Sequence, residues 1–264
     1  MNLLNYPGSK AKLAAEIIGM MPKHRSYLEP FFGSGSVFFR KEKSPIETIN
    51  DLDGDVVNFF RVLRDDPERL AREVRMIPFS RAEYDDAWEN PGRDEFDRAV
   101  RFLIRSKMAF GKKLHEKTGF KIDTIGREAG YAVAEWNALP EEIRVCAGRL
   151  KEAQIENRPA LDVIRRFDSP EVLMYLDPPY LPETRSGGRM YSKEMTAADH
   201  EELLHEILRT KARVILSGYG SELYDEALHQ WHRREKKAYA QGGLRRTEVI
   251  WCNFEPDDGQ MGLF

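Results

Sequence analysis

Short apolar or β-branched runs bounded by turn residues alternate along this chain with segments of helical periodicity. We expect the runs to form buried strands, at residues 44–50, 153–156, 172–176, 214–217 and 249–254. We expect helices at residues 10–20, 54–64, 140–150 and 197–209, with Thr196 as the N-cap of the last. Strands that alternate with helices form open, largely parallel sheets, so the pattern predicts an α/β fold with ligand sites beyond the carboxyl ends of its strands.

Residues 62–139 depart from this alternation. The stretch is rich in charged and aromatic residues at helical spacing, it has few strand-like runs, and prolines and a glycine punctuate it. We read it as a mostly helical insertion, with Pro140 marking the return to the sheet. The predicted organisation is a sheet domain of residues 1–61 and 140–264, interrupted by an insertion of residues 62–139.

At 264 residues and 41% hydrophobic content, the chain can build a large core. No run approaches the roughly 18 apolar residues of a membrane span, and the N-terminus lacks the pattern of a secretory signal. We therefore expect a cytoplasmic protein. Cys146 and Cys252 lack metal-ligand spacing. We expect both to be core thiols, and we expect no metal site.

The sequence Asp177-Pro178-Pro179-Tyr180 directly follows the apolar run 172–176. Proline lacks an N–H and stiffens a turn, so nearby carbonyls can point at a ligand. Asp177 supplies a carboxylate at a strand end, and Tyr180 a flat face on which a base can stack. An amine held between Asp177 and the Pro178 carbonyl would donate both hydrogens, which turns its lone pair toward an electrophile. We predict a catalytic turn, with a simple N-capping turn as the structural alternative.

The segment LEPFFGSGSVF, residues 28–38, indicates a short strand that runs into Gly33 and Gly35 before a helix. Small residues there let the backbone approach a bound nucleoside. A dinucleotide fingerprint requires a third glycine three positions after the second, where this chain has Phe38, so a nicotinamide cofactor is disfavoured. A turn without a ligand is the alternative.

Two further features favour a nucleoside site. Asp51 ends a predicted strand about 16 residues after Gly35, where a carboxylate can accept hydrogen bonds from both ribose hydroxyls. Asp53 and Asp55 fit a helix cap or solvated charges better. The turn at residues 5–10 precedes a predicted helix, and Lys10 there suits an anionic group such as a carboxylate of the cofactor.

Two segments carry dense positive charge although the formal net charge is −3. Between Arg105 and Lys121 six basic residues accompany one acid, and between Arg233 and Arg246 six accompany Glu235. Aromatic residues interleave both runs, which favours a phosphate-binding surface over solvated helix faces. In the first run the candidate phosphate-binding residues are Arg105, Lys107, Lys112, Lys113 and Lys117.

Taken together, these motifs resemble the Dam-like, or alpha-class, DNA adenine-N6 methyltransferases, in particular a phage- or prophage-type member. The likeness spans nearly the whole chain, with the cofactor motifs first, target recognition next and the catalytic motif last. It also includes Tyr191 with His200 and residues 154–157, 216–219 and 248–251.

The resemblance implies a Rossmann-like S-adenosylmethionine-dependent methyltransferase sheet with an inserted, mostly helical DNA-recognition domain. The implied partner is double-stranded DNA, bound by a monomer or weak dimer, and the implied chemistry is methylation of a flipped adenine. The resemblance assigns the contacts to S-adenosylmethionine to Tyr6, Lys10, Asp51, Asp177 and Asn157, with Gly33 and Gly35 forming the cofactor loop.

One departure concerns the target sequence. Residues 106–130 share the basic, Gly- and Phe-containing character of the family's recognition segment but lack the Arg-Tyr-Asn and Asn-Val-Pro elements of GATC-specific members. The resemblance therefore does not extend to that target.

Two other functions remain open at this point. RNA and protein-glutamine methyltransferases also present an amine to a proline-rich turn, although they resemble an Asn-Pro-Pro-aromatic pattern where this chain has Asp177. A DNA-binding relative without catalysis is the other alternative, and the complete catalytic and cofactor motifs speak against it.

Overall fold

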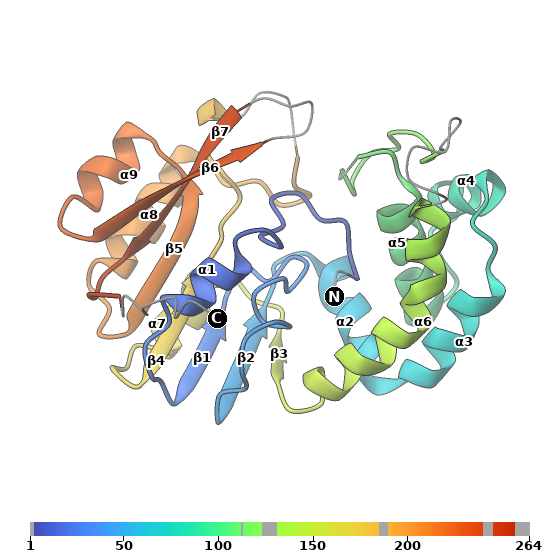
Figure 1. The fold of residues 1–264 in the computed structure, drawn as a ribbon, viewed down its shortest axis with the longest axis horizontal. Helices are drawn as coiled ribbons and strands as arrows, with labels where there is room; N and C mark the ends of the chain where they lie inside the picture. The colour runs from blue at the N-terminus through green and yellow to red at the C-terminus, as the bar shows by residue number, and fades with distance from the viewer. Residues whose placement is uncertain (1–2, 112, 123–130, 185–189, 240–244, 257–264) are drawn as a thin grey trace, which may run out of the picture.

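The computed structural model describes residues 3–111, 113–122, 131–184, 190–239 and 245–256. In this part of the chain one seven-stranded sheet has the order β3-β2-β1-β4-β5-β7-β6 (Figure 1). The strands are β1 (Ser26–Glu29), β2 (Ile46–Asn50), β3 (Gln154–Glu156), β4 (Val172–Leu176), β5 (Arg213–Tyr219), β6 (His232–Tyr239) and β7 (Arg245–Cys252). The first five run parallel, and β7 lies antiparallel between β5 and β6. The expected α/β fold with a largely parallel, Rossmann-like sheet is confirmed.

The helices follow the expected alternation in most places. They are α1 (Ala14–Gly19), α2 (Gly54–Asp65), α3 (Pro67–Met76), α4 (Arg81–Glu89), α5 (Glu95–Met108), α6 (Tyr131–Leu150), α7 (Ala160–Arg166), α8 (Ala197–Ile207) and α9 (Glu222–Ala227), with a 3₁₀ turn, η1 (Pro182–Thr184). Thr196 caps α8 through a reciprocal capping box with Asp199, as the sequence predicts. Helix α1 is shorter than expected, because residues 10–13 form turns.

Each side of the sheet buries its own set of side chains. Along β4, Leu173 and Tyr175 belong to one hydrophobic cluster, while Met174 and Leu176 belong to the other. This alternation follows from the two-residue repeat of a strand. Both faces of the central parallel strands are therefore covered, which explains why all five residues of β4 are buried. Cys146 and Cys252 are buried free thiols, as expected.

Helices α3 to α6 lie beside the sheet, with α2 between them and β3 (Figure 1). Their apolar side chains, including Leu70 and Leu103, belong to the same hydrophobic cluster as Tyr27 and Ile215 of the sheet. The helical region therefore shares a core with the sheet.

Pro140 lies inside α6, so the helix expected at residues 140–150 begins earlier, at Tyr131. Proline commonly ends a helix because it lacks an N–H donor. Here Leu139 and Ile143, on either side of it, are fully buried, and α6 packs along α2 and α3. This packing keeps the helix continuous through the proline.

One further local expectation differs from the structure. The segment after Gly35 forms successive turns at residues 36–40 in place of a regular helix. Only ten residues separate Gly35 from the start of β2, which leaves little room for a helix before the chain returns. Of the basic run between Arg233 and Arg246, the residues up to Tyr239 belong to edge strand β6, and charged residues are typical of exposed sheet edges.

Candidate active site

The loops that follow three adjacent parallel strands meet around one cavity. β1 pairs with β2 on one side and β4 on the other, so residues after Glu29, Asn50 and Leu176 emerge together at the carboxyl edge. The connections that follow β1 and β4 lead to opposite sides of the sheet here, and open α/β sheets bind their ligands at such a point. The cavity measures about 240 Å³. Of the candidate residues, those that line it are Tyr6, Lys10, Gly33, Asp51, Asp177 and Pro179.

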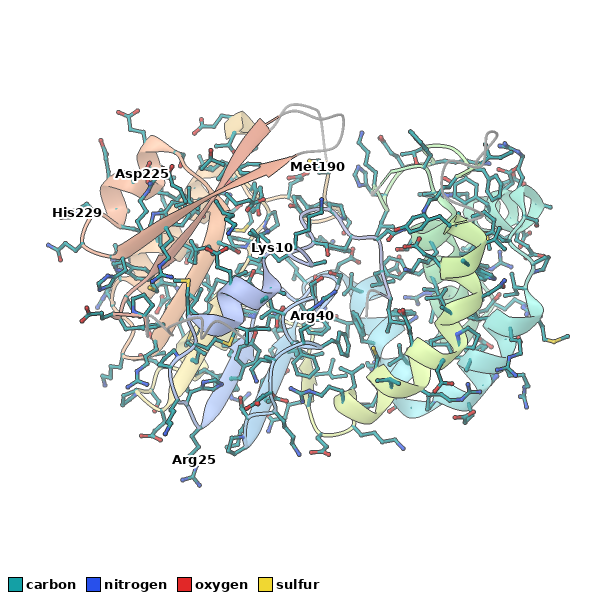
Figure 2. The ribbon with its side chains drawn as sticks, viewed as in Figure 1. Lys10, Arg25, Arg40, Met190, Asp225 and His229 are labelled. Carbon is teal, nitrogen blue, oxygen red and sulfur yellow. The ribbon has the colours of Figure 1, made fainter. Side chains whose placement is uncertain are left out.

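Lys10 occupies the interior of the molecule, whereas Arg25, just before β1, lies at the amino-terminal end of the strands (Figure 2). Lys10 is 4% exposed although it comes from the N-terminal turn. The sequence gives no direct sign of this burial, because a lysine at a chain terminus is ordinarily solvated.

Asp51 follows β2 and is held by backbone donors on both carboxylate oxygens. The Gly33 N–H donates to Oδ2 at 2.8 Å, and the Asp53 N–H donates to Oδ1 at 2.9 Å. Burial raises the pKa of Asp51 to about 6, against the opposing effect of these two N–H groups. Asn157 lies close by, where its amide donates to the Asp51 carbonyl at 2.7 Å. It therefore positions the strand end and does not line the cavity.

The glycines of the loop after β1 adopt backbone conformations that other residues rarely take, with φ of 51° at Gly33 and 63° at Gly35. A Cβ on Gly33 would lie 2.9 Å from the Tyr6 ring, which lines the cavity. A Cβ on Gly35 would lie 2.5 Å from the Phe32 ring. Gly33 thus makes room for the Tyr6 ring at the cavity wall, whereas Gly35 makes room for the Phe32 and Phe39 rings to pack against the loop.

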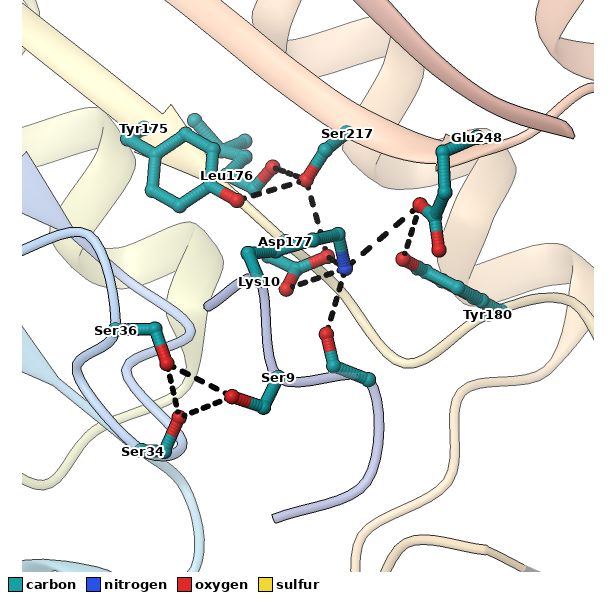
Figure 3. A network of polar contacts seen from close by, with 11 residues as sticks. Ser9, Lys10, Ser34, Ser36, Tyr175, Leu176, Asp177, Tyr180, Ser217 and Glu248 are labelled. Atoms are coloured by element: carbon teal, nitrogen blue, oxygen red, sulfur yellow. Dashed lines mark hydrogen bonds and ion pairs between the residues drawn. The ribbon is translucent and has the colours of Figure 1, made fainter. Parts of the chain in front are cut away.

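Lys10 and Asp177 form a buried ion pair at the end of β4 (Figure 3). Lys10 Nζ donates to Asp177 Oδ1 at 2.7 Å and Oδ2 at 2.8 Å, and to the Gly8 carbonyl at 2.8 Å. The Ser217 hydroxyl, from β5, donates to Asp177 Oδ1 at 3.0 Å. Burial raises the pKa of Asp177, while Lys10 and Ser217 oppose the rise. The Asp177 carboxylate is therefore held by Lys10 of the N-terminal turn and by Ser217 of β5.

Tyr180 is 6% exposed and does not line the cavity. Its hydroxyl donates to Glu248 Oε2 at 2.9 Å, and its ring meets the Tyr219 ring edge-to-face at 4.5 Å between centroids. Lys10 Nζ lies 4.7 Å from the Tyr180 ring centre. Pro178 is buried as well, so Asp177 and Pro179 are the residues of the predicted catalytic turn that line the cavity.

The segment 190–195 forms part of the cavity wall opposite the strand ends. Glu194 accepts the N–H groups of Met190 and Tyr191 at 2.7 and 2.9 Å, and Ser192 hydrogen-bonds to Asp53. Asp53 also caps α2, as expected, by accepting the Asp55 N–H at 3.0 Å. The Asp53 side chain thus joins this segment to the loop that carries Asp51.

Glu29 is a cavity residue that the sequence reasoning missed. It is 2% exposed at the end of β1 and accepts the Tyr27 hydroxyl at 2.8 Å. Burial raises the pKa of Glu29 to about 8. The signal was available, because an acid at a strand end is the same feature that identified Asp51 and Asp177.

The basic residues of the helical region are mostly engaged with acids. Lys113 pairs with Glu116 at 2.5 Å, and Lys117 lies 2.7 Å from Asp85. The Arg105 side chain is 21% exposed and lies 3.6 Å from an Asp55 carboxylate oxygen. Lys112 lies outside the described residues.

Lys107 is 5% exposed, and burial lowers its pKa. This burial argues against the phosphate interaction expected of Lys107, because its ammonium does not reach the surface. Lys113 and Lys117 remain accessible, with side chains 37% and 42% exposed.

The family model for D12 class N6 adenine-specific DNA methyltransferases matches residues 6–240, most of the chain. The chain belongs to this family. It transfers a methyl group to the N6 amine of adenine in DNA, and the family uses S-adenosylmethionine as the methyl donor. The alternatives of an RNA or protein substrate, or of a binding protein without catalysis, are not favoured.

Similar proteins include a DNA adenine methylase from Vibrio cholerae, 25% identical over 220 residues, covering 80% of this chain and 76% of that protein. Another is the Type II methyltransferase M1.LlaDCHI from Lactococcus lactis subsp. cremoris, 23% identical, covering 94% of both chains. Among solved structures, a SAM-dependent methyltransferase from Agrobacterium tumefaciens aligns with a TM-score of 0.38 and 12% identity, over 91% of this chain and 59% of its own.

Within the described ranges, no helix is long and apolar enough to cross a membrane.

Proposed function

We propose that the cavity at the carboxyl edge of the sheet binds S-adenosylmethionine and that the turn from Asp177 to Tyr180 receives an adenine rotated out of the DNA duplex. One observation carries the proposal: the predicted ribose ligand, Asp51, and the predicted catalytic acid, Asp177, line the same cavity although they follow different strands. A site for the donor and a site for the amine are therefore contiguous.

The residues of the cavity fit the cofactor. Asp51 provides a charged acceptor for the ribose hydroxyls, since each of its oxygens has a free lone pair beyond the backbone bonds described above. Phe31, Pro159 and Leu161 give the cavity an apolar side suited to an adenine ring. Asn157 supports this region from behind, through the Asp51 carbonyl.

Lys10 takes a role different from the one that its position in the sequence suggests. Its ammonium already donates to the Gly8 carbonyl and to both oxygens of Asp177. An ammonium has three hydrogens, so little donor capacity remains for a carboxylate of the cofactor. We assign Lys10 to holding Asp177 ionised and oriented.

Bound S-adenosylmethionine supplies a methyl group already activated on a sulfonium, so catalysis rests on positioning and electrostatics. In our proposal Asp177 and the Pro178 carbonyl each accept one hydrogen of the target amine, which turns the nitrogen lone pair out of conjugation. The Asp177 charge then stabilises the positive charge that develops on the nitrogen. The surplus proton leaves to water.

The adenine must leave the duplex, at a cost of a few kcal/mol. Stacking on Tyr180, worth about 1–3 kcal/mol, would offset much of this cost. Because only 6% of Tyr180 is exposed, stacking requires the groups that cover its ring to move aside when DNA binds.

We place the DNA along the helical region, where Lys113 and Lys117 are accessible. Surface ion pairs such as theirs are worth about 0–1 kcal/mol, so a phosphate can replace the acid partner. We further expect the protein to work in the cytoplasm as a monomer or weak dimer. The reaction requires no metal, since the methyl group is already activated.

A methyl-transfer assay with labelled S-adenosylmethionine and duplex DNA tests the proposal. Asp177→Ala should lower turnover by about 10²–10⁴-fold, because the carboxylate both orients the amine and stabilises its charge. Tyr180→Ala should weaken capture of the flipped base, seen as a smaller signal from a fluorescent base analogue at the target. Cofactor affinity should stay close to that of the parent for Tyr180→Ala. Turnover of Asp177→Ala within threefold of the parent would rule out the assigned role.

A further inference from the structure

Glu248, on β7, is a buried acid for which the mechanism above has no use. It is 9% exposed, and its Oε2 accepts the Tyr180 hydroxyl at 2.9 Å. The same oxygen lies 3.9 Å from Lys10 Nζ. Burying a carboxylate is costly unless charges and donors compensate it. Here the compensating groups are a residue of the catalytic turn and the partner of the catalytic acid.

The contacts of Glu248 join the two halves of the catalytic turn (Figure 3). Lys10 bridges Asp177 and Glu248, and Tyr180, three residues after Asp177, returns to Glu248 through its hydroxyl. β7 pairs with β5, which carries Ser217, the other partner of Asp177. The orientation of the turn is thus determined by two neighbouring antiparallel strands as well as by its own prolines.

We propose that Glu248 is a positioning residue for methyl transfer: it anchors the Tyr180 hydroxyl through their hydrogen bond, and thereby fixes the Tyr180 ring relative to the Asp177 carboxylate, which Lys10 holds. It contacts neither the adenine nor the methyl donor. The inference rests on the roles proposed above for Asp177 and Tyr180.

Three variants separate the hydrogen bond from the charge. Glu248→Ala removes both, Glu248→Gln keeps an acceptor for the Tyr180 hydroxyl, and Tyr180→Phe removes the donor while keeping the ring. Glu248→Ala should lower kcat by about tenfold or more, because it eliminates a hydrogen bond to a buried charged group. Glu248→Gln should stay within about threefold of the parent. In all three, cofactor affinity measured by calorimetry should change by less than about twofold.

The decisive measurement combines Glu248→Ala with Tyr180→Phe in a double-mutant cycle. If the two side chains act through one hydrogen bond, the double variant should turn over about as slowly as the slower single variant. Tyr224→Phe is the matched control, since it removes a buried tyrosine hydroxyl that bonds to His200 Nδ1 at 2.7 Å outside the cavity lining. It should leave kcat unchanged.

Several results would overturn the inference. Effects of Glu248→Ala and Tyr180→Phe that multiply in the double variant would show that the side chains act independently. Glu248→Gln as slow as Glu248→Ala would assign the effect to charge. If Glu248→Ala does not fold, kcat of Tyr180→Phe within twofold of the parent decides against the anchor. An active Asp177→Ala would refute the proposed catalytic turn itself. If Asp177→Ala is inactive but the effects of Glu248→Ala and Tyr180→Phe multiply, only the role of Glu248 is refuted.

Discussion

Lys10 Nζ lies 2.7 and 2.8 Å from the two carboxylate oxygens of Asp177, although 167 positions separate the residues in the chain. The pair ties the N-terminal turn to the catalytic turn. The Lys10 side chain is 3% exposed and that of Asp177 18%, so their attraction is weakly screened by solvent and salt.

Replacing Lys10 with Met should therefore shift the pH dependence of methyl transfer. Burial raises the pKa of Asp177, and Lys10 is the main opposing influence, so its removal raises that pKa further. Since the proposed mechanism uses the ionised Asp177 carboxylate, the acid limb of the kcat/KM profile should move to higher pH. Lys10→Arg, which keeps the charge, should show a smaller displacement. Superimposable acid limbs for Lys10→Met and the parent would contradict the pairing in solution.

Cofactor affinity should depend on pH through Asp51, whose pKa burial raises to about 6. The carboxylate is charged above that value and protonated below it, so affinity for S-adenosylmethionine should be higher at pH 7.5 than at pH 5.5. Asp51→Asn, measured alongside by calorimetry, removes the titrating group while leaving the ionisations of the cofactor in place. The affinity of Asp51→Asn for S-adenosylmethionine should be lower than that of the parent at pH 7.5. It should also lack the change with pH that comes from titration of Asp51. The assignment fails if both proteins respond to pH alike.

Gly35→Ala should destabilise the fold. The residue has φ of 63°, and a Cβ would meet the Phe32 and Phe39 rings at 2.5 and 2.7 Å. The strained backbone and the overpacked cluster together should cost about 1–3 kcal/mol in the free energy of unfolding. Denaturant titration measures this cost. Gly148→Ala is the control, since a Cβ there meets nothing within 4 Å. It should be neutral or slightly stabilising, because alanine favours a helix.

Lys113→Ala combined with Lys117→Ala should weaken binding to specific and random duplexes alike. Removing one cation that neutralises a phosphate should reduce the log–log salt slope by about 0.9, so the double variant should flatten the slope by about one to two units. Lys43→Ala, at an exposed lysine near the amino-terminal end of β2, is the control. An unchanged salt slope would show that these lysines do not contact phosphates and that DNA binds elsewhere on the protein. A weaker preference for one DNA sequence would mean that the lysines contact bases.

The core of the site was predictable because its signals are local. Asp51 and Asp177 each directly follow a strand that is mostly or wholly buried, and parallel strands bring their carboxyl ends to one edge. Gly33 and Gly35 similarly indicated a tight loop. What the spacing could not indicate was the ion pair of Lys10 with Asp177, because it depends on how a terminal turn folds back over the sheet.

The misjudged parts depend on tertiary packing. β6 carries a charged sequence that has no strand-like apolar alternation, and only its place beside β7 makes it a strand. Lys107 has the sequence surroundings of a phosphate ligand, but α5 turns it inward to 5% exposure. Pro140 indicated a helix start, whereas α6 begins at Tyr131 and packing on both sides keeps it continuous through the proline. Such outcomes follow from contacts between distant segments, which composition does not encode.

The unbroken helix α6 and the shared core bear on how target preference can change in this family. A recognition unit with its own core could be exchanged between relatives as a cassette. Here a graft of residues 62–139 would cut α6 at its middle and would remove side chains against which the sheet packs. The described residues just after α5 include a side chain less committed to this core: beside the antiparallel bridge of Ala109 with Phe120, Phe110 is 68% exposed. New specificities would therefore arise by changing such residues on a retained helical frame.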